Sequence, residues 1–201
     1  MHRLPTTERF TPTHPQVFRR LVDECMAQKL AGLTKAYQAR RLEPFHHVLT
    51  EFVQRPGKRV RPLLFLQAAE LFRPDMPAYA MADLVSVAAG LELLHTFVLI
   101  HDDLIDGSDL RRTLPSLHRA FEGKLKGGTQ PERTGFNLAI VFGDLLFALA
   151  QKCITDTRIP VRDALLSRTL AYVFDTGYGE IADILFGESC ISQVSSREVE
   201  F

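Results

Sequence analysis

The chain has 201 residues, of which 46% are hydrophobic, and its 24 basic and 24 acidic side chains cancel. This apolar content is enough for a folded core and excludes a disordered chain. Because there is no net charge, no overall field attracts nucleic acid or an anionic membrane, so we expect no nucleic-acid partner and look for local clusters of charge.

Apolar residues recur at three and four positions along most of the chain, which predicts an all-α fold. A proline-containing leader, residues 1–14, lacks the apolar core of a secretory signal. A first amphipathic helix is predicted over residues 15–33. Its buried stripe is predicted to contain Val17, Leu21, Cys25 or Met26, and Leu30.

A shorter helix is predicted over residues 43–53, and Pro62 is predicted to open a third helix that ends at residue 72. Proline suits this first helical position, because its missing N–H would have no partner there. Three basic residues, Lys58, Arg59 and Arg61, therefore cluster at a helix N-terminus.

A long helix is predicted from Pro77 to about Asp106, and thirty residues would span roughly 45 Å. Its most apolar run, residues 84–100, carries Glu92 and His95. These polar residues suit a buried helix of a globular protein better than a membrane span, so we expect no transmembrane segment.

The remaining chain alternates polar loops with three helical segments. The last two of these segments are apolar over most of their circumference and should lie inside a helical assembly. "SSRE" at 195–198 resembles the capping start of another helix. The predicted elements are a loop over 107–116, a short helix over 117–123, and long helices over 134–154 and 160–187.

The three cysteines are far apart, and their odd number argues against a disulfide framework. This usage is typical of a reducing compartment, so we expect a cytoplasmic protein.

Asp102, Asp103 and Asp106 close the long predicted helix. Residues four apart on a helix point the same way, so Asp102 and Asp106 share a face and Asp103 lies aside. Two carboxylates in this arrangement repel each other unless a cation lies between them, and such hard oxygen ligands suit Mg²⁺. The alternative is an acidic helix end with Asp103 and Asp106 facing water.

Positive charge lies on both sides of these aspartates. The basic cluster at the helix N-terminus either binds an anion such as diphosphate or is a solvated turn. Arg111 and Arg112 either pair weakly with Asp106 or Asp109 across the loop or bind phosphate oxygens as forks. His95 lies two turns before Asp102 and either donates to a phosphate or is a hydrogen-bonded core residue.

Together these clusters describe a pocket with two diphosphates at its mouth and apolar tails below, and the sequence resembles the trans-isoprenyl (polyprenyl) diphosphate synthase family. The matching segments come in the family's order and cover nearly all of residues 40–187. They are "GKRVRP" at 57–62, "LLHTFVLIHDDLID" at 93–106, "LRRTLPSLH" at 110–118, "GDLLFA" at 143–148 and "GEIADI" at 179–184.

The resemblance implies an isoprenoid-synthase-type helical bundle, Mg²⁺ as cofactor and a homodimer. It implies that an allylic diphosphate ionises and that its cation is attacked by isopentenyl diphosphate, with loss of a proton. The implied site residues are Asp102 and Asp106 for magnesium, Arg111 for the allylic diphosphate, and Lys58, Arg61, His95 and Arg112 for isopentenyl diphosphate.

In this family, bulk just before the first aspartate sets the product length. Phe97, five residues before Asp102, lies about one and a half turns deeper along the helix, and its neighbour Val98 is smaller. An aromatic floor at Phe97 predicts a short product, such as farnesyl or geranylgeranyl diphosphate. The alternative is that Phe97 is an ordinary core residue.

The sequence departs from the family pattern at Thr113, where glycine is usual, and at Glu180, where glutamine is usual. It also lacks the second aspartate-rich motif, so we expect residues 1–201 to form a single incomplete domain without its C-terminal helices. This is interpreted either as a portion of a longer enzyme or as a truncated, non-catalytic partner subunit.

Two other classes of protein compete with this interpretation. His101–Asp102 on a helix would suit a metal phosphohydrolase of the HD type, with His46, His47 or His118 completing the metal site. That hypothesis leaves "GKRVRP" and the arginine pair unexplained. The second class is a helical interaction module, which would have neither prenyltransferase nor phosphohydrolase activity.

Overall fold

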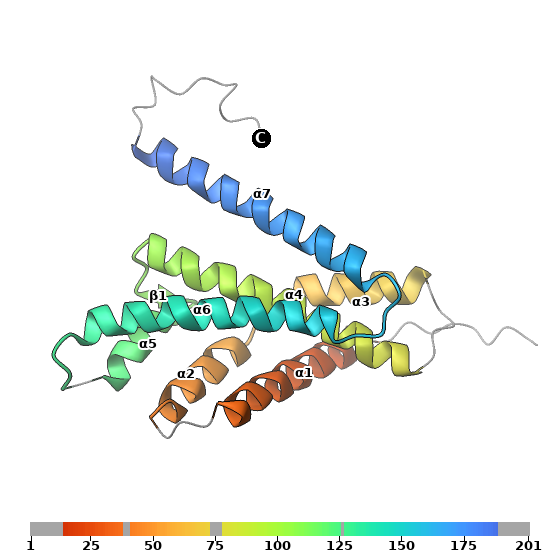
Figure 1. The fold of residues 1–201 in the computed structure, drawn as a ribbon, viewed down its shortest axis with the longest axis horizontal. Helices are drawn as coiled ribbons and strands as arrows, with labels where there is room; N and C mark the ends of the chain where they lie inside the picture. Colours follow the sequence, from red (N-terminus) through yellow and green to blue (C-terminus); the bar gives the residue numbers. More distant parts are fainter. Residues whose placement is uncertain (1–13, 38–40, 73–77, 126, 189–201) are drawn as a thin grey trace, which may run out of the picture. The chain divides into compact units, whose positions relative to one another are not determined.

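The computed structural model describes residues 14–37, 41–72, 78–125 and 127–188. These residues form seven helices and one small hairpin (Figure 1), which confirms the predicted all-α class. The elements are α1 Pro15–Ala36, α2 Glu43–Gln54, α3 Val60–Phe72, α4 Ala78–Ile105, β1 Leu110–Arg111, β2 Leu114–Pro115, α5 Leu117–Lys124, α6 Pro131–Thr155 and α7 Arg162–Glu188.

The chain divides after Ile159 into two compact units, the first with α1 to α6 and the second with α7. The second unit is a single helix among the described residues, so the predicted burial of this helix in an assembly stays a prediction. The same holds for the prediction that residues 1–201 form one domain. Residues 1–13 of the leader and the "SSRE" segment lie outside the described residues.

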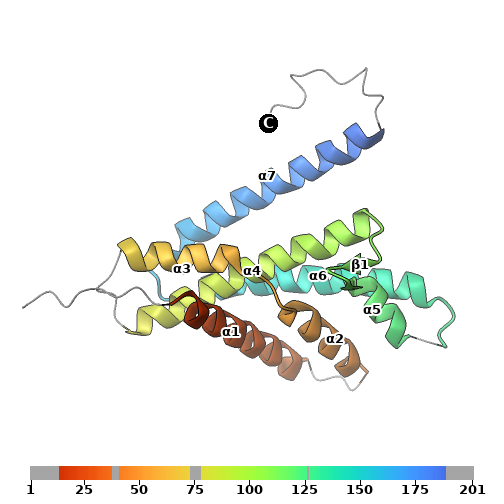
Figure 2. The same ribbon diagram turned by 180° about the vertical axis from the view of Figure 1, so that it is seen from behind.

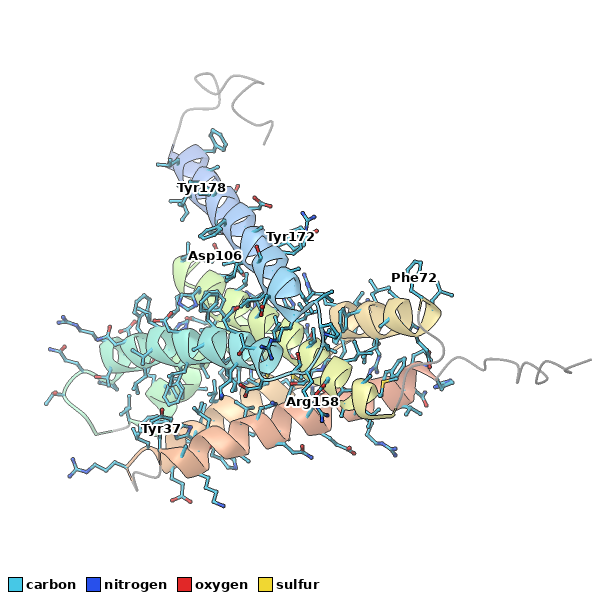
Figure 3. The ribbon with its side chains drawn as sticks, turned by 45° about the vertical axis from the view of Figure 1, so that its right-hand side comes forward. Tyr37, Phe72, Asp106, Arg158, Tyr172 and Tyr178 are labelled. Atoms are coloured by element: carbon cyan, nitrogen blue, oxygen red, sulfur yellow. The ribbon has the colours of Figure 1, made fainter. Side chains whose placement is uncertain are left out.

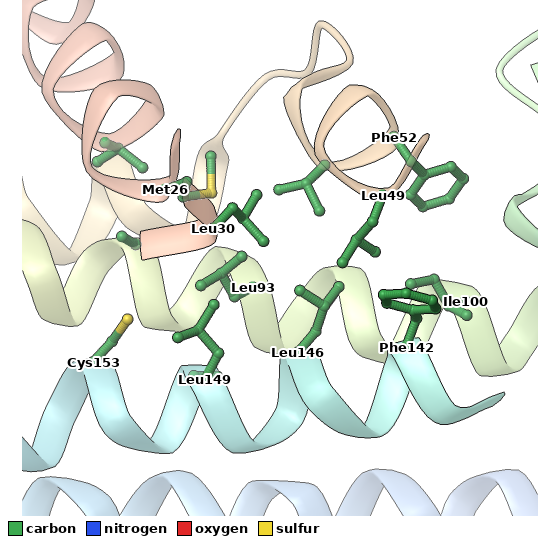
Figure 4. Packing of buried hydrophobic residues seen from close by; sticks show 14 of the residues in the cluster. Met26, Leu30, Leu49, Phe52, Leu93, Ile100, Phe142, Leu146, Leu149 and Cys153 are labelled. Atoms are coloured by element: carbon green, nitrogen blue, oxygen red, sulfur yellow. The ribbon is translucent and has the colours of Figure 1, made fainter. Parts of the chain in front are cut away.

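The long helix α4 is the centre of the first unit, as expected for a spine, because α1, α3 and α6 all pack against it. Figure 2 shows α1 and α3 from behind, next to α4. The core lies where α1 and α2 face α4 and α6, and Figure 4 shows its side chains interlocking. Leu30, Leu49, Leu93 and Leu146 contribute one side chain from each of these four helices and are at most 1% exposed.

The predicted buried stripe of α1 is right for Leu30 and for the alternative Met26, but is one position early at Val17 and Leu21. Two adjacent rows of α1 are apolar, so periodicity alone does not decide between them. The row with the large Phe18 faces the core, whereas Val17 is 39% exposed and Leu21 and Cys25 lie at the core's edge. The buried row is Phe18, Val22, Met26 and Leu30.

The third helix begins at Val60 and not at Pro62. Arg59 has a left-handed φ of 52°, and its carbonyl accepts the first helical hydrogen bond, from the amide of Leu63 at 3.1 Å. Pro62 is therefore inside the first turn, where a missing N–H still leaves no partner unsatisfied.

The predicted loop before the short helix contains a two-stranded hairpin. Leu110 pairs with Pro115 and Arg111 pairs with Leu114, which leaves Arg112 and Thr113 as the two turn residues. Their φ values of 53° and 68° match the two-residue turn that fits the twist of paired strands. The sequence pattern hides this hairpin, because each strand has only two residues.

Two helical stretches, Ala80–Ile105 and Pro131–Thr155, are long and apolar enough to span a membrane. In the first unit they are core helices, with 61% and 44% of their most apolar windows buried inside the structure. Because core helices of folded proteins pass the same test, this is weak evidence for a membrane span. The expectation of no transmembrane segment stays a prediction.

Gly90 allows α4 to approach α6 closely, because an added Cβ would lie 2.9 Å from the Ala150 carbonyl oxygen and from the Cys153 Cβ. Gly90→Ala should lower the free energy of unfolding by about 1–3 kcal/mol through overpacking. Gly32→Ala is the matched control, because a Cβ there meets nothing within 4 Å. It should raise the free energy by about 0.5–1 kcal/mol through helix propensity. Urea denaturation measures both, and a stabilising Gly90→Ala would contradict the close approach.

Candidate functional site

A cleft of about 370 Å³ lies between the C-terminal half of α4 and the hairpin. Its wall combines carboxylates, guanidinium groups and an imidazole with the apolar side chains of Leu99 and Leu110. Figure 3 shows Asp106 at the end of α4. The structure thereby brings five predicted site residues to one cleft, namely His95, Asp102, Asp106, Arg111 and Arg112.

Arg111 is held as a fork between two adjacent aspartates. Its Nη2 donates to Asp102 Oδ2 at 2.6 Å, and its Nε donates to Asp103 Oδ1 at 2.8 Å. These hydrogen bonds, that with Asp103 first, raise the pKa of Arg111 above its ordinary value. The guanidinium is therefore a permanent and fixed positive charge at the cleft wall.

Asp103 is buried, with only 1% of its surface exposed, so the alternative in which it faces water is wrong. Its carboxylate points to the hairpin while Asp102 and Asp106 line the cleft. The physical reason is the quarter-turn offset between neighbouring helical residues, combined with a hairpin that supplies Arg111 on that side. Asp106 is exposed, as that alternative expected.

The hairpin that carries Arg111 is anchored on its other side by Arg119 of α5. The Arg119 guanidinium donates to Glu122 at 2.7 Å and to Asp109 at 2.6 Å, and these hydrogen bonds, that with Glu122 first, raise the pKa of Arg119. Thr113 stands in the turn with a φ of 68°, a conformation that glycine adopts without strain and a β-branched residue resists. Having threonine in place of glycine at position 113 therefore affects the backbone conformation of the turn and removes no ligand-binding side chain.

Arg112 connects the hairpin to the basic loop before α3. Its Nη1 donates to the carbonyl oxygen of Pro56 at 2.9 Å. The same nitrogen would lie 2.8 Å from a Cβ placed on Gly57, so a larger residue there would displace it. The alternative in which the two arginines pair with Asp106 or Asp109 is thus wrong for both, because Arg111 pairs with Asp102 and Asp103 of α4.

The basic residues of the loop separate into two kinds. Lys58 and Arg61 are exposed, as anion-binding side chains should be, whereas Arg59 is 6% exposed and its charge is turned inward. The prediction of one solvent-facing cluster is therefore wrong for Arg59. Neither Lys58 nor Arg61 is among the described residues that line the cleft, although the charge of Arg61 reaches His95.

His95 is half-buried, and burial is the largest cause of a lowered pKa, followed by the positive charge of Arg61. The charges of Arg112 and Arg111 lower this pKa further, and Glu92 opposes them. These effects favour the neutral imidazole, which can donate one N–H. Because folding lowers this pKa, the folded state binds protons less readily, and the contribution of His95 destabilises the fold as the pH falls through about 6.5.

Phe97 and Val98 are both half-buried, and neither is among the described residues that line the cleft. The Phe97 ring lies 4.6 Å from the His101 ring and 5.1 Å from that of Phe147 on α6, measured between centroids. The predicted floor is thus one member of an aromatic cluster between α4 and α6. Its role in product length stays a prediction.

Asp102 and Asp106 fit a magnesium ion by their chemistry, because Mg²⁺ is bound by one or two carboxylates together with waters and phosphate oxygens. A metal held by protein groups alone is less suited to this cleft. Across residues 14–37, 41–72, 78–125 and 127–188, no three His, Cys, Asp or Glu side chains form a group that could hold a metal.

The same finding counts against the HD-type phosphohydrolase. The His101 ring faces the Phe97 carbonyl at 3.1 Å and Asp144 of α6 at 3.5 Å. His46 packs on Phe142, and His118 contacts Ser116 at 3.3 Å. Among the histidines proposed for that metal site, His101, His46 and His118 thus have other contacts, and His47 is exposed.

Sequence reasoning missed the roles of Asp103, Arg59 and Glu92. Glu92 was visible as a charge inside an apolar run, and such a residue needs a buried partner of opposite charge. That partner is Arg59, which lies 33 positions away in the chain. Sequence spacing alone does not reveal a pairing over that distance.

The family model for polyprenyl synthetase matches residues 43–198 of this chain. A geranylgeranyl diphosphate synthase of Sulfolobus acidocaldarius is 31% identical over 77% of the chain and 39% of that protein. A farnesyl diphosphate synthase of Geobacillus stearothermophilus is 40% identical over 56% of the chain and 34% of that protein. The chain thus spans less than half the length of these curated relatives.

Solved structures show the same fold. Geranylgeranyl pyrophosphate synthase of Corynebacterium glutamicum, complexed with isoprenyl diphosphate and magnesium, matches with a TM-score of 0.62 and 31% identity over 72% of this chain and 42% of that one. Geranyltranstransferase of Thermotoga maritima matches with a TM-score of 0.68 and 27% identity over 94% of this chain and 61% of that one. The isoprenoid-synthase type of the bundle is thereby confirmed.

Asp103→Asn should lower the free energy of unfolding by about 2–4 kcal/mol, because it removes one charge of a buried ion pair and leaves Arg111 poorly matched. Asp106→Asn, three residues further along and just past the end of α4, is the matched control. Since Asp106 is exposed, its substitution should change the free energy by no more than about 0.5 kcal/mol. Thermal unfolding by circular dichroism compares the two, and equal effects would show that the Asp103 pair does not stabilise the fold.

Proposed function

The chain belongs to the polyprenyl synthetase family, and from this premise we propose that it is a trans-prenyltransferase that joins an allylic diphosphate to isopentenyl diphosphate. One observation carries the proposal: acidic and basic groups face each other across a single cleft. Asp102 and Asp106 line it together with Arg111, Arg112 and His95. The comparisons support this reading, because the relatives are named as synthases of short-chain prenyl diphosphates.

The charges of the cleft favour a diphosphate bound through a cation. Two carboxylates alone would repel a diphosphate, whereas arginines alone would bind one without a metal. A cleft with both kinds of charge suits a diphosphate together with Mg²⁺, which Asp102 and Asp106 would hold, while a guanidinium would bind oxygens of the diphosphate. Magnesium bound in this way would supply positive charge to a departing diphosphate.

The protein's own contribution is to place fixed charge where negative charge develops. Arg111 is already locked by Asp102 and Asp103, so it need not reorganise as the carbon–oxygen bond of the allylic substrate breaks. Burial lowers the pKa of His95 and so favours the neutral imidazole, whose N–H would donate to the diphosphate of isopentenyl diphosphate. We assign Lys58, Arg61 and Arg112 to that same diphosphate, as the family resemblance implies. Lys58 lies in the loop before α3, Arg61 in the first turn of α3 and Arg112 in the hairpin turn.

The carbon chemistry needs a surface without nucleophiles, because an allylic cation is quenched by water. Leu99 gives the cleft an apolar wall, and the aromatic cluster of Phe97 and Phe147 lies on the same stretch of α4. We propose a short product, of the farnesyl or geranylgeranyl type, with Phe97 as the floor beside the smaller Val98. A cytoplasmic location and a homodimer are further proposals, supported by the free thiols of Cys25 and Cys153 and by the family resemblance respectively.

The proposal is tested by incubating the chain with labelled isopentenyl diphosphate, an allylic diphosphate and Mg²⁺ and measuring extractable prenyl product. Asp102→Asn should reduce the rate by about 100-fold or more, because charge stabilisation at a leaving group typically has this weight. Asp156→Asn is the matched control, since Asp156 ends α6 in an ion pair with Lys152, outside the cleft. Chelation of Mg²⁺ should abolish product formation in all three proteins.

Absence of product from the parent chain would reject the prenyltransferase proposal for this chain. A non-catalytic partner subunit would then be recognised if calorimetry still detected Mg²⁺-dependent binding of diphosphate that Asp102→Asn removes. Release of phosphate from nucleotides, which the cleft chemistry does not predict, would instead favour a phosphohydrolase.

Phe97→Ala should lengthen the products, because it removes the ring proposed as the floor for the growing chain. Phe72→Ala removes the same atoms from a side chain that is 80% exposed on α3, and should leave product length unchanged. Chromatography of the dephosphorylated products reads out the chain length. An unchanged distribution from a folded Phe97→Ala protein would mean that Phe97 is an ordinary core residue.

A further inference from the structure

Arg59 is an arginine whose environment is unlike that of its basic neighbours. Its side chain is 6% exposed, and its backbone has a left-handed φ of 52°. A left-handed backbone conformation costs free energy in a residue other than glycine, and burying a charged guanidinium costs more. Such a costly combination persists only where several surrounding contacts hold it in place.

Four contacts hold the Arg59 guanidinium. Its Nε donates to Asp23 of α1 at 2.9 Å, and its Nη1 donates to Glu92 of α4 at 3.0 Å. Its Nη2 donates to the carbonyl oxygens of Val53 at 3.2 Å and Arg55 at 3.3 Å, at the end of α2. One side chain at the start of α3 thus connects three other helices.

These contacts leave Arg59 unsuited to bind a substrate itself. All three of its nitrogens already donate, and it is not among the described residues that line the cleft. Its neighbours in sequence have the opposite character, because Lys58 and Arg61 are exposed on either side of it. The buried contacts therefore fix the backbone from which these two free charges project.

Glu92 extends the same connection to the cleft. It lies three residues before His95 on α4, so it belongs to the adjacent turn of the same helix. The Arg59–Glu92 pair consequently ties the basic loop to the part of α4 that presents His95. Glu92 is 8% exposed in its side chain, so solvent does little to weaken this pair.

We propose that Arg59 is a positioning residue, which through Glu92 and Asp23 sets the distance between Lys58, Arg61 and His95 and so determines affinity for isopentenyl diphosphate. The inference rests on the proposed function. It predicts an effect mainly on one of the two substrates, because the hydrogen bonds of Arg59 go to Asp23, Glu92 and the end of α2 and to neither Asp102 nor Asp106.

The test replaces the pair with apolar residues of similar size, as Arg59→Met/Glu92→Leu. Arg59→Met alone would leave Glu92 buried without a partner and is expected to unfold, whereas replacing both charges is often neutral for stability. Asp23 has a side chain that is 41% exposed and can be hydrated when Arg59 is gone. Arg20→Met/Glu24→Leu is the matched control, an ion pair on α1 with side chains 70% and 58% exposed.

In the double variant the KM for isopentenyl diphosphate should rise about tenfold, which corresponds to about 1.4 kcal/mol, while the KM for the allylic diphosphate stays within about twofold. The control should leave both values unchanged. If the pair had only a structural role, its replacement would change kcat and both KM values together, or would change none of the three. Either of those results in a folded protein would overturn the positioning role.

A second measurement does not need activity. The Leu63 amide donates to the Arg59 carbonyl at 3.1 Å, so its hydrogen exchange reports whether the loop is anchored. Exchange at Leu63 should accelerate about tenfold in the double variant and in Arg59→Lys, which keeps the charge but lacks the planar fork. If the parent chain makes no product, the proposed function fails while this measurement still decides the anchoring, and unchanged exchange in both variants would reject it.

Discussion

The site depends on the pairing of opposite charges at the end of an apolar helix. Asp103 cannot be hydrated where it lies, so it needs a cation, and the hairpin supplies Arg111 at 2.8 Å. The same guanidinium also donates to Asp102. The side chain of Arg111 therefore fixes the position of the hairpin and the orientation of the carboxylate that faces the cleft. The acidic and basic walls of the cleft are therefore built by one interaction and cannot move independently.

A second set of contacts extends this arrangement from the hairpin to the basic loop. Arg112 reaches the Pro56 carbonyl over Gly57, and Arg59 reaches Glu92 inside the fold. In both cases the planar guanidinium group donates hydrogen bonds in defined directions, so it holds its partner in a fixed orientation as well as supplying charge. The exposed Lys58 and Arg61, and the half-buried His95, remain available for a ligand because these other arginines bear the structural role.

Much of the fold was predictable, because long helices with three- and four-residue apolar spacing have few alternatives. The long central helix and the pairing of Asp102 with Asp106 on one face follow from that spacing. Other features were not predictable for stated reasons. Two apolar rows on α1 were equivalent until Phe18 was seen to face the core, and a hairpin with two-residue strands leaves no alternating pattern. The left-handed φ of Thr113 is likewise set by the two-residue turn, and a glycine would adopt it without strain.

The sequence by itself determined the chemistry: carboxylates four apart at a helix end, basic residues on both sides of them, and an apolar helix below. These are properties of local spacing, and local spacing is read directly from a chain. Only the tertiary structure decided which charges are free and which are used for support. Arg59 and Arg61 look alike in sequence, as do Asp103 and Asp106, yet one of each is buried in an ion pair. Burial depends on contacts between residues far apart in the chain, such as Arg59 with Glu92, and these contacts exist only once the helices have packed.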